Sequence, residues 1–238
     1  GYTSPAPGVR DFAIELFKSC YAAGLGEPAL NDSKGCGGVM RVAPVGLYAW
    51  HFRSRQTLEE VFALGCALAA LTHGHPTGSL AGGVLAVLVF RLVAGGRLID
   101  AIGDAKGCLR RLPDHAETLR AIEQAETLSQ SQSSPIDAIA ALGEGWTAEE
   151  ALAIGLYCAL VAGSFKEGVI LAVNHDGDSD STGAIAGHLL GLMHGVQGIP
   201  GDWLAPLELR ELIVQVADDL ACLDTVDPNL LAERYPGY

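Results

Sequence analysis

Basic residues are scarce in this sequence of 238 residues. Lys and Arg together number 15 against 28 Asp and Glu, so the formal net charge is −13, and no basic run occurs. Nucleic-acid binders neutralise phosphates with Lys and Arg, so the composition argues against a nucleic-acid partner. An anionic ligand fits such an acidic chain only where local dipoles or a bound cation reverse the field.

The sequence also lacks a long apolar run and paired cysteines. Its longest apolar run, from Leu80 to Phe90, falls short of the ~20 residues that span a bilayer, so we expect a buried core helix and no membrane partner. No CxxC pair and no secretory segment is recognisable, which predicts reduced thiols and a cytoplasmic location. The six single cysteines are Cys20, Cys36, Cys66, Cys108, Cys158 and Cys222.

Signals for β-structure are missing as well, whereas helix signals are frequent. There is no Asn-Gly hairpin signal and little alternation of period two. An oxygen side chain followed three residues later by Glu predicts helix starts. A C-terminal apolar stripe has helical spacing, and "SQSQSSP" (129–135) is typical of a loop. We therefore predict an all-α fold in one compact multi-helix domain, residues 1–238. The predicted caps are Thr57, Asp114, Thr147 and Ser164, and the stripe is Leu209, Leu212, Ile213, Val216 and Leu220.

One predicted helix carries an unusual glycine pattern. In "TGAIAGHLLGLMHG", Gly183, Gly187, Gly191 and Gly195 stand four apart and so share roughly one face. Each glycine costs up to ~1 kcal/mol of helix propensity relative to Ala. The close approach of another helix would compensate for this cost, and the close approach of a ligand is the alternative.

The stretch "NHDGDSDST" (174–182) precedes that helix and places Asp176, Asp178 and Asp180 at every second position. Three carboxylates this close repel one another unless water or a cation offsets their charge. A solvated acidic turn is the simplest interpretation, and a metal site is the alternative.

The metal interpretation can be refined from the spacing. An EF-hand starting at Asp176 would need Gly where Ser181 stands and a bidentate Glu where Gly187 stands, so that motif is excluded. The remaining metal hypothesis is a catalytic hard-cation site. Its oxygen ligands would come from Asp178, Asp180 and Ser181 at the start of a helix.

A glycine-rich stretch, "NDSKGCGGVMRVAPVG" (31–46), precedes the core helices. It lacks the GK[ST] of a Walker loop, and Met40 stands where a dinucleotide fingerprint needs its third glycine. The glycines still allow backbone N–H groups to approach an anion closely, although an ordinary tight turn is the alternative. Cys36, near Lys34 and Arg41, invites the hypothesis of a lowered pKa and a nucleophilic role, but no sequence feature pairs it with a histidine.

The stretch "THGHPTG" (72–78) contains His73 and His75. No Cys or third His clusters nearby to complete a zinc site. A histidine at a helix end that faces a ligand, with His75 and Pro76 shaping the turn, is one interpretation. A histidine that caps the C-terminus of a helix is the other.

Taken together, "SKGCGGVMRVAPVGL", "THGHPTGSLAGG" and "AVNHDGDSDSTGAIAGHLLG" resemble the ADP-ribosylglycohydrolase family in order and spacing, from Asn31 to Trp203. The resemblance implies an all-α domain with a binuclear Mg²⁺ or Mn²⁺ centre. It implies a hydrolase that cleaves the glycosidic bond between ADP-ribose and an acceptor side chain or small molecule, so ADP-ribose or an ADP-ribosylated protein would be the partner.

Carried over by motif, Asp178 and Asp180 are the implied catalytic residues, and they form the implied metal site together with Ser181. Ser181 stands where Thr is usual and keeps the hydroxyl group. Two further positions depart from the family pattern, with Cys36 where Asn is common and Asp176 where Gly is usual. The ligand contacts that the resemblance implies are Gly35, Cys36, Gly37, Gly38, Met40, His73 and Gly177.

The family also draws metal ligands from an N-terminal Thr-Asp-Asp motif. Before Asp32 this sequence has only Asp11, Glu15 and Glu27 as acids, and it opens on Gly1. We therefore expect that segment to be missing from this chain, with a single-ion or empty metal site and little hydrolysis. A catalytically impaired ADP-ribose-binding or structural homologue is the alternative function, and a phosphohydrolase acting on a diphosphate is a third.

Overall fold

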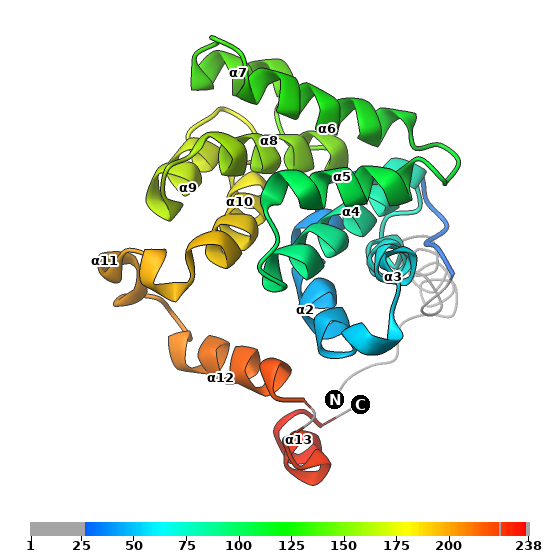
Figure 1. Cartoon of the computed structure of the whole chain (residues 1–238), viewed down its shortest axis with the longest axis vertical. Coiled ribbons are helices and arrows are strands. Elements are labelled where there is room, and N and C mark those ends of the chain that lie inside the picture. The colour runs from blue at the N-terminus through cyan, green and yellow to red at the C-terminus, as the bar shows by residue number, and fades with distance from the viewer. Residues whose placement is uncertain (1–26, 224, 237–238) are drawn as a thin grey trace, which may run out of the picture.

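The computed structural model describes residues 27–223 and 225–236. Within these residues the chain forms helices and no β-strand (Figure 1). Asp11, Glu15 and Cys20 lie outside the described residues. The predicted all-α fold is confirmed, while the single-domain boundaries stay a prediction. The helices are α2 (Ala43–His51), α3 (Leu58–Ala70), α4 (Pro76–Val93), α5 (Leu98–Leu109), α6 (Ala116–Ser129), α7 (Pro135–Leu142), α8 (Ala148–Val161), α9 (Phe165–Val173), α10 (Ser179–His194), α11 (Gly201–Leu204), α12 (Arg210–Ala221) and α13 (Pro228–Arg234), with 3₁₀ turns η1 (Val39–Arg41), η2 (Arg53–Arg55) and η3 (Val196–Gly198).

Helices α4 and α8 form the centre of the bundle. Helix α4 packs against α2, α3, α5, α8 and α10, and α8 packs against α6, α9 and α10. In Figure 1, α6 and α7 lie at the top of the bundle, and α12 and α13 at the bottom. Helix α4 is apolar and long enough to cross a membrane by length and composition, but 78% of it is buried inside the protein. The run from Leu80 to Phe90 is therefore a core helix, as predicted.

Close contact between α3 and α4 depends on glycine. A Cβ atom at Gly65 would lie 2.7 Å from the Gly82 carbonyl oxygen, and one at Gly82 would lie 3.0 Å from the Gly65 carbonyl oxygen. These two backbones therefore touch directly, and a side chain at either position would force the helices apart.

The predicted helix starts are partly confirmed. Thr57 forms a full capping box with the glutamate three residues later, and the Ser164 hydroxyl caps α9. Thr147 occupies the N-cap position of α8, but its side chain makes no capping bond. Asp114 is not an N-cap, because its φ of 56° is left-handed and α6 begins only at Ala116. A left-handed residue cannot hold its side chain over the following turn as an N-cap does.

The glycine face of α10 is only partly packed. A Cβ atom at Gly183 would lie 2.6 Å from Val173 of α9, so helix packing explains that position. Gly195 has a φ of 68° and forms the C-cap, which favours glycine. Gly187 has no described atom within 4 Å of its Cβ position, and at Gly191 the nearest is 3.9 Å away. Close helix packing therefore accounts for Gly183 but not for Gly187 among the described residues, and the close approach of a ligand stays the alternative there.

Two further sequence predictions concern the loop at 129–135 and the C-terminal stripe. Residues 130–134 form the loop between α6 and α7, and the five described cysteines are free thiols. The stripe builds helix α12, but Leu209 precedes the helix in a left-handed conformation. Its neighbours Leu212, Ile213 and Val216 remain exposed, so this apolar face does not enter the core.

Candidate functional site

The glycine-rich loop is held in place by the segment that leads into α8. The Cys36 amide donates to the Trp146 carbonyl oxygen at 3.0 Å. The Ala148 amide donates to the Lys34 carbonyl oxygen at 2.8 Å, and the two segments form one antiparallel bridge. The position of the loop is thus fixed by backbone bonds to a segment more than a hundred residues away in the chain.

The same segment also holds the acidic loop before α10. The Asp178 amide donates to the Glu144 carbonyl oxygen at 2.8 Å. A Cβ atom at Gly177 would lie 1.8 Å from that carbonyl oxygen, so only glycine fits here without displacing one of the two backbones. Gly177 thus has a role in backbone packing, and the ligand contact that the resemblance implies for it stays a prediction.

His175 braces the acidic loop from within. Its Nδ1 accepts from the Gly177 amide at 3.1 Å, so Nε2 carries the proton and donates to the Thr182 hydroxyl oxygen at 2.9 Å. Thr182 is fully buried and donates to the Ala172 carbonyl oxygen at 2.6 Å. This network was not identified from the sequence, although His175 stands directly before the aspartates.

The two loops meet at Asp178, which lies 142 residues from Cys36 in the sequence. The Cys36 thiol donates to Asp178 Oδ2 at 2.5 Å. The Ser181 hydroxyl lies 3.3 Å from Cys36 Sγ and 3.1 Å from Met40 Sδ, and its single proton serves one sulfur at a time. The structure therefore brings together four residues that the sequence analysis singled out separately.

Asp178 and Asp180 flank the N-terminus of α10 and interact directly. Asp178 is buried with an exposed fraction of 9%, and burial acts to raise its pKa, but hydrogen bonds from Asp180 and Cys36 outweigh burial and lower it. The pKa of the exposed Asp180 is raised, mainly by its hydrogen bond with Asp178 and by the charge of Asp178. Two carboxyl groups that share a site shift in opposite directions in this way, because ionisation of one disfavours ionisation of the other.

Asp176 does not join this pair. It is exposed and lines a separate cavity of about 350 Å³ between the end of α7 and the acidic loop. The sequence placed three aspartates at alternating positions, but the chain turns into α10 after Asp178, so only two carboxylates converge.

Cys36 is not activated as a nucleophile, contrary to the hypothesis from its basic neighbours. Burial and the hydrogen bond to Asp178 together raise the pKa of the Cys36 thiol to about 11. The Lys34 ammonium, which was expected to lower the pKa of the thiol, instead forms ion pairs with Glu117 and Glu149. The nucleophile hypothesis was wrong because the nearest charge is an aspartate from a distant loop.

The ring of His73 lies against the glycine-rich loop. Cβ atoms at Gly35 and Gly37 would lie 3.4 Å from ring atoms of His73, and one at Gly38 would lie 3.1 Å from its Nδ1. Except at Gly38, these distances are ordinary contacts, and none of the three glycines has a positive φ. The His73 ring therefore packs against all three glycines, and the ligand role of these residues stays a prediction.

Burial lowers the pKa of His73, and the Arg41 guanidinium adds to the effect, so His73 is neutral at physiological pH. Its Nδ1 lies 2.7 Å from the Thr72 hydroxyl oxygen, which also accepts from Arg41. His75 shapes the turn together with Pro76, as one interpretation of the sequence has it: its Nδ1 accepts from the Thr77 amide at 3.1 Å and caps the N-terminus of α4, which begins at Pro76.

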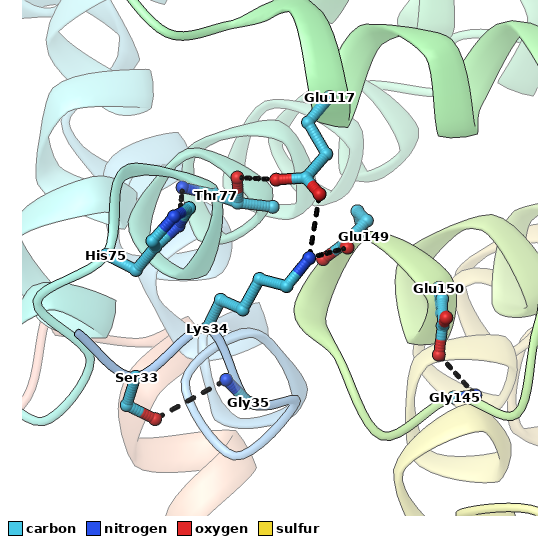
Figure 2. A network of polar contacts seen from close by, with 9 residues as sticks. All are labelled: Ser33, Lys34, Gly35, His75, Thr77, Glu117, Gly145, Glu149 and Glu150. Carbon is cyan, nitrogen blue, oxygen red and sulfur yellow. Dashed lines mark hydrogen bonds and ion pairs between the residues drawn. The ribbon is translucent and has the colours of Figure 1, made fainter.

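Lys34 has no direct role at an anion site in this conformation. Its ammonium lies 2.7 Å from Glu117 of α6 and 2.8 Å from Glu149 of α8 (Figure 2). The hydrogen bonds to these carboxylates raise the pKa of Lys34. This network was missed in the sequence because its members are 83 and 115 residues apart from Lys34.

The side chains of Asp178, Asp180 and Ser181 offer oxygen atoms, which are the ligand type that hard divalent cations prefer. The raised pKa of Asp180 beside Asp178 reflects negative charge that a cation would relieve. Mg²⁺ is held in many proteins by only one or two carboxylates together with water. Among the described residues, however, no group of three His, Cys, Asp or Glu side chains is arranged to hold a metal ion, so the binuclear centre that the resemblance implies stays a prediction.

Comparison with known proteins gives consistent matches. A family model described as ADP-ribosylglycohydrolase matches residues 8–229. The ADP-ribosyl-(dinitrogen reductase) glycohydrolase of Rhodospirillum rubrum is 30% identical over 165 residues, covering 68% of this chain and 49% of the relative. The ADP-ribosylarginine hydrolase Tri1 of Pseudomonas putida is 25% identical over 208 residues, covering 85% of this chain and 51% of the relative. The chain thus spans about half the length of these curated relatives.

A solved structure agrees with these matches. The ADP-ribosylglycohydrolase-related protein complex superimposes with a TM-score of 0.65 and 29% sequence identity, covering 81% of this chain and 61% of that one. Both the helical bundle and the sequence similarity therefore extend over most of the described residues.

Proposed function

Because the chain belongs to the ADP-ribosylglycohydrolase family, we propose that it carries the ADP-ribose site of a hydrolase that cleaves the bond between ADP-ribose and an acceptor. The observation that carries this proposal is the contact between the glycine-rich loop and the acidic loop. Cys36 and Asp178 touch at 2.5 Å although 142 residues separate them. The elements that the resemblance assigns to one ligand thus form one site.

In this proposal the glycine-rich loop holds the ADP-ribose. The backbone amide of the half-buried Gly37 donates to its diphosphate, as the backbone of a glycine-rich loop does at an anion site. Arg41 supplies positive charge beside the loop, which an acidic chain needs at an anion site. The neutral ring of His73 orients the ligand from the side of α3.

Asp178 and Asp180 then position the reacting end of the ligand. Asp178 is fixed by the Glu144 carbonyl oxygen and the Cys36 thiol, whereas the exposed Asp180 accepts hydrogen bonds from ribose hydroxyl groups. Mg²⁺ or Mn²⁺ held by Asp178, Asp180 and Ser181 would supply Lewis-acid activation of the attacking water. The binuclear centre and the choice of ion belong to the proposal, as does the acceptor.

The test is release of ADP-ribose from ADP-ribosylated arginine and serine peptides, with Mg²⁺ or Mn²⁺ and with a chelator. We expect metal-dependent release that Asp178→Asn abolishes. Asp176→Asn is the matched control, because it removes a neighbouring carboxylate that faces a separate cavity. Equal loss in both variants would show that local charge, and not the site geometry, supports the reaction.

A second function is favoured by one observation. The described residues gather only two carboxylates, and Cys36 places sulfur beside Asp178. Sulfur is a poor neighbour for a hard cation, so an ADP-ribose-binding homologue without turnover is the alternative. Binding of ADP-ribose with no release from any peptide would favour it.

We also propose a cytoplasmic location and an ADP-ribosylated protein as the partner. The five free cysteines of the described residues support a reducing compartment. Fractionation of cells that express the tagged protein tests the location.

A further inference from the structure

Lys34 belongs to a polar network beneath the glycine-rich loop. Its ammonium bridges Glu117 and Glu149, and the Thr77 hydroxyl donates to the second oxygen of Glu117 at 2.6 Å (Figure 2). Glu149 is only 7% exposed, and its second oxygen has no hydrogen-bond partner among the described residues. Lys34 therefore provides the hydrogen bond to the first oxygen of this buried carboxylate, and the ion pair holds Lys34 at the first turn of α8.

The backbone next to Lys34 is joined to residues 144–148, called here the connector. The Lys34 carbonyl oxygen accepts from Ala148 at the end of the connector, and the Cys36 amide donates to Trp146 in its middle. At the other end, the Glu144 carbonyl oxygen accepts from Asp178. One short segment thus bonds to the glycine-rich loop and to the acidic loop.

The connector has little room to adjust. Gly145 has a φ of 82°, and its amide donates to Glu150 of α8 at 3.1 Å. A Cβ atom there would lie 2.8 Å from Thr182, just as one at Gly177 would lie 1.8 Å from Glu144. Because these backbones are in contact, a shift of one loop displaces the connector and with it the other loop.

We propose that Lys34 is a positioning residue that sets the spacing between the two loops of the candidate site, by fixing the glycine-rich loop and the connector to α6 and α8. Lys34 acts through Cys36 and Asp178 and touches no ligand, since two carboxylates occupy its ammonium. The proposal deepens the proposed function, because the site that it organises is the ADP-ribose site.

The experiment compares Lys34→Met with Lys106→Met. Lys106 forms a similar ion pair, 2.5 Å from Glu126, between α5 and α6 and outside the two loops. Amide hydrogen exchange by NMR is followed at Cys36, Ala148 and Asp178. We expect faster exchange at all three amides in Lys34→Met and no change in Lys106→Met.

Titration with ADP-ribose provides the second readout. We expect Lys34→Met to weaken binding roughly two- to thirtyfold, which is typical for residues that couple to a site through a network. Lys106→Met should bind like the unsubstituted protein. Lys34→Met alone leaves two carboxylates unpaired and could fail to fold for that reason. The triple variant Lys34→Met, Glu117→Gln, Glu149→Gln removes these unpaired charges and should retain the fold. The exchange and affinity effects should persist in it.

Each outcome decides a separate point. Unchanged exchange at Asp178, with faster exchange at Cys36 and Ala148, would overturn the coupling of the two loops. A lowered thermal midpoint with unchanged amide exchange and unchanged affinity would show that the ion pairs of Lys34 stabilise the fold and do not position the loops. If the unsubstituted protein does not bind ADP-ribose, the proposed ligand is wrong, and the exchange data still decide whether Lys34 positions the loops.

Discussion

Asp178 combines more constraints than any other side chain of the candidate site. Its backbone is bonded to the connector, its carboxylate accepts from Cys36, and it forms a hydrogen bond with Asp180. The Cys36 thiol is consequently a hydrogen-bond donor that orients Asp178. This arrangement explains why a cysteine beside two aspartates does not act as a thiolate.

The first prediction concerns the reactivity of Cys36. With a pKa raised to about 11, only about one molecule in a thousand carries the thiolate at pH 8. Iodoacetamide should therefore label Cys36 far more slowly than the exposed Cys222. Mass spectrometry of peptides after timed labelling measures both rates in one sample, and faster labelling of Cys36 would contradict its bond to Asp178.

The second prediction concerns Glu117. The hydrogen bond from Lys34 lowers the pKa of this carboxyl group below its ordinary value of 4.5, and the bond from Thr77 lowers it further. A lowered folded-state pKa gives stability that is present at neutral pH and lost as pH falls through that pKa. Glu117→Gln should therefore lower the thermal midpoint at pH 7, and the difference should shrink between about pH 4.5 and pH 3. A difference independent of pH would contradict the ion pair.

Among the secondary-structure elements, the turn between α7 and α8 and the turn between α9 and α10 depend on each other. Gly177 and Glu144 are in backbone contact, so these two turns form one unit beneath the site. Helix α10 begins directly after this unit, and its first turn therefore carries Asp180 and Ser181 in fixed positions.

The third prediction compares two glycines of this region. Gly177→Ala should lower the free energy of unfolding by about 1–3 kcal/mol, because its Cβ would overlap the Glu144 carbonyl oxygen. Gly187→Ala should raise it by about 1 kcal/mol, because alanine is the better helix former and the position is open among the described residues. Chemical denaturation measures both, and equal changes would contradict the close packing at Gly177.

The sequence predicts those parts of the fold that local pattern controls. The apolar run of α4, the capping box at Thr57 and the aspartates at the start of α10 each depend on neighbouring residues, and the structure has them in place. The raised pKa of Cys36 and the partners of Lys34 depend on residues more than eighty positions away, which spacing cannot reveal. The "GEGW" turn was a missed signal, since two glycines directly before a predicted helix favour positive φ.

For the molecule as a whole, the acidic net charge limits which ligands bind, and the length of the chain decides which test of function is most direct. A net charge of −13 disfavours an anionic ligand unless the loop backbone, Arg41 and a cation act together. The chain spans about half the length of its curated relatives, so binding of ADP-ribose is a more direct test of the site than turnover.

The central claim is that ADP-ribose binds along the glycine-rich loop, where Cys36 contacts Asp178, with help from a divalent cation. Calorimetric titration of ADP-ribose in the presence of Mg²⁺ tests it directly. The account predicts binding by the unsubstituted protein and by Asp176→Asn, and at least roughly tenfold weaker binding by Asp178→Asn or after removal of Mg²⁺. Equal affinity of Asp178→Asn and the unsubstituted protein would contradict it.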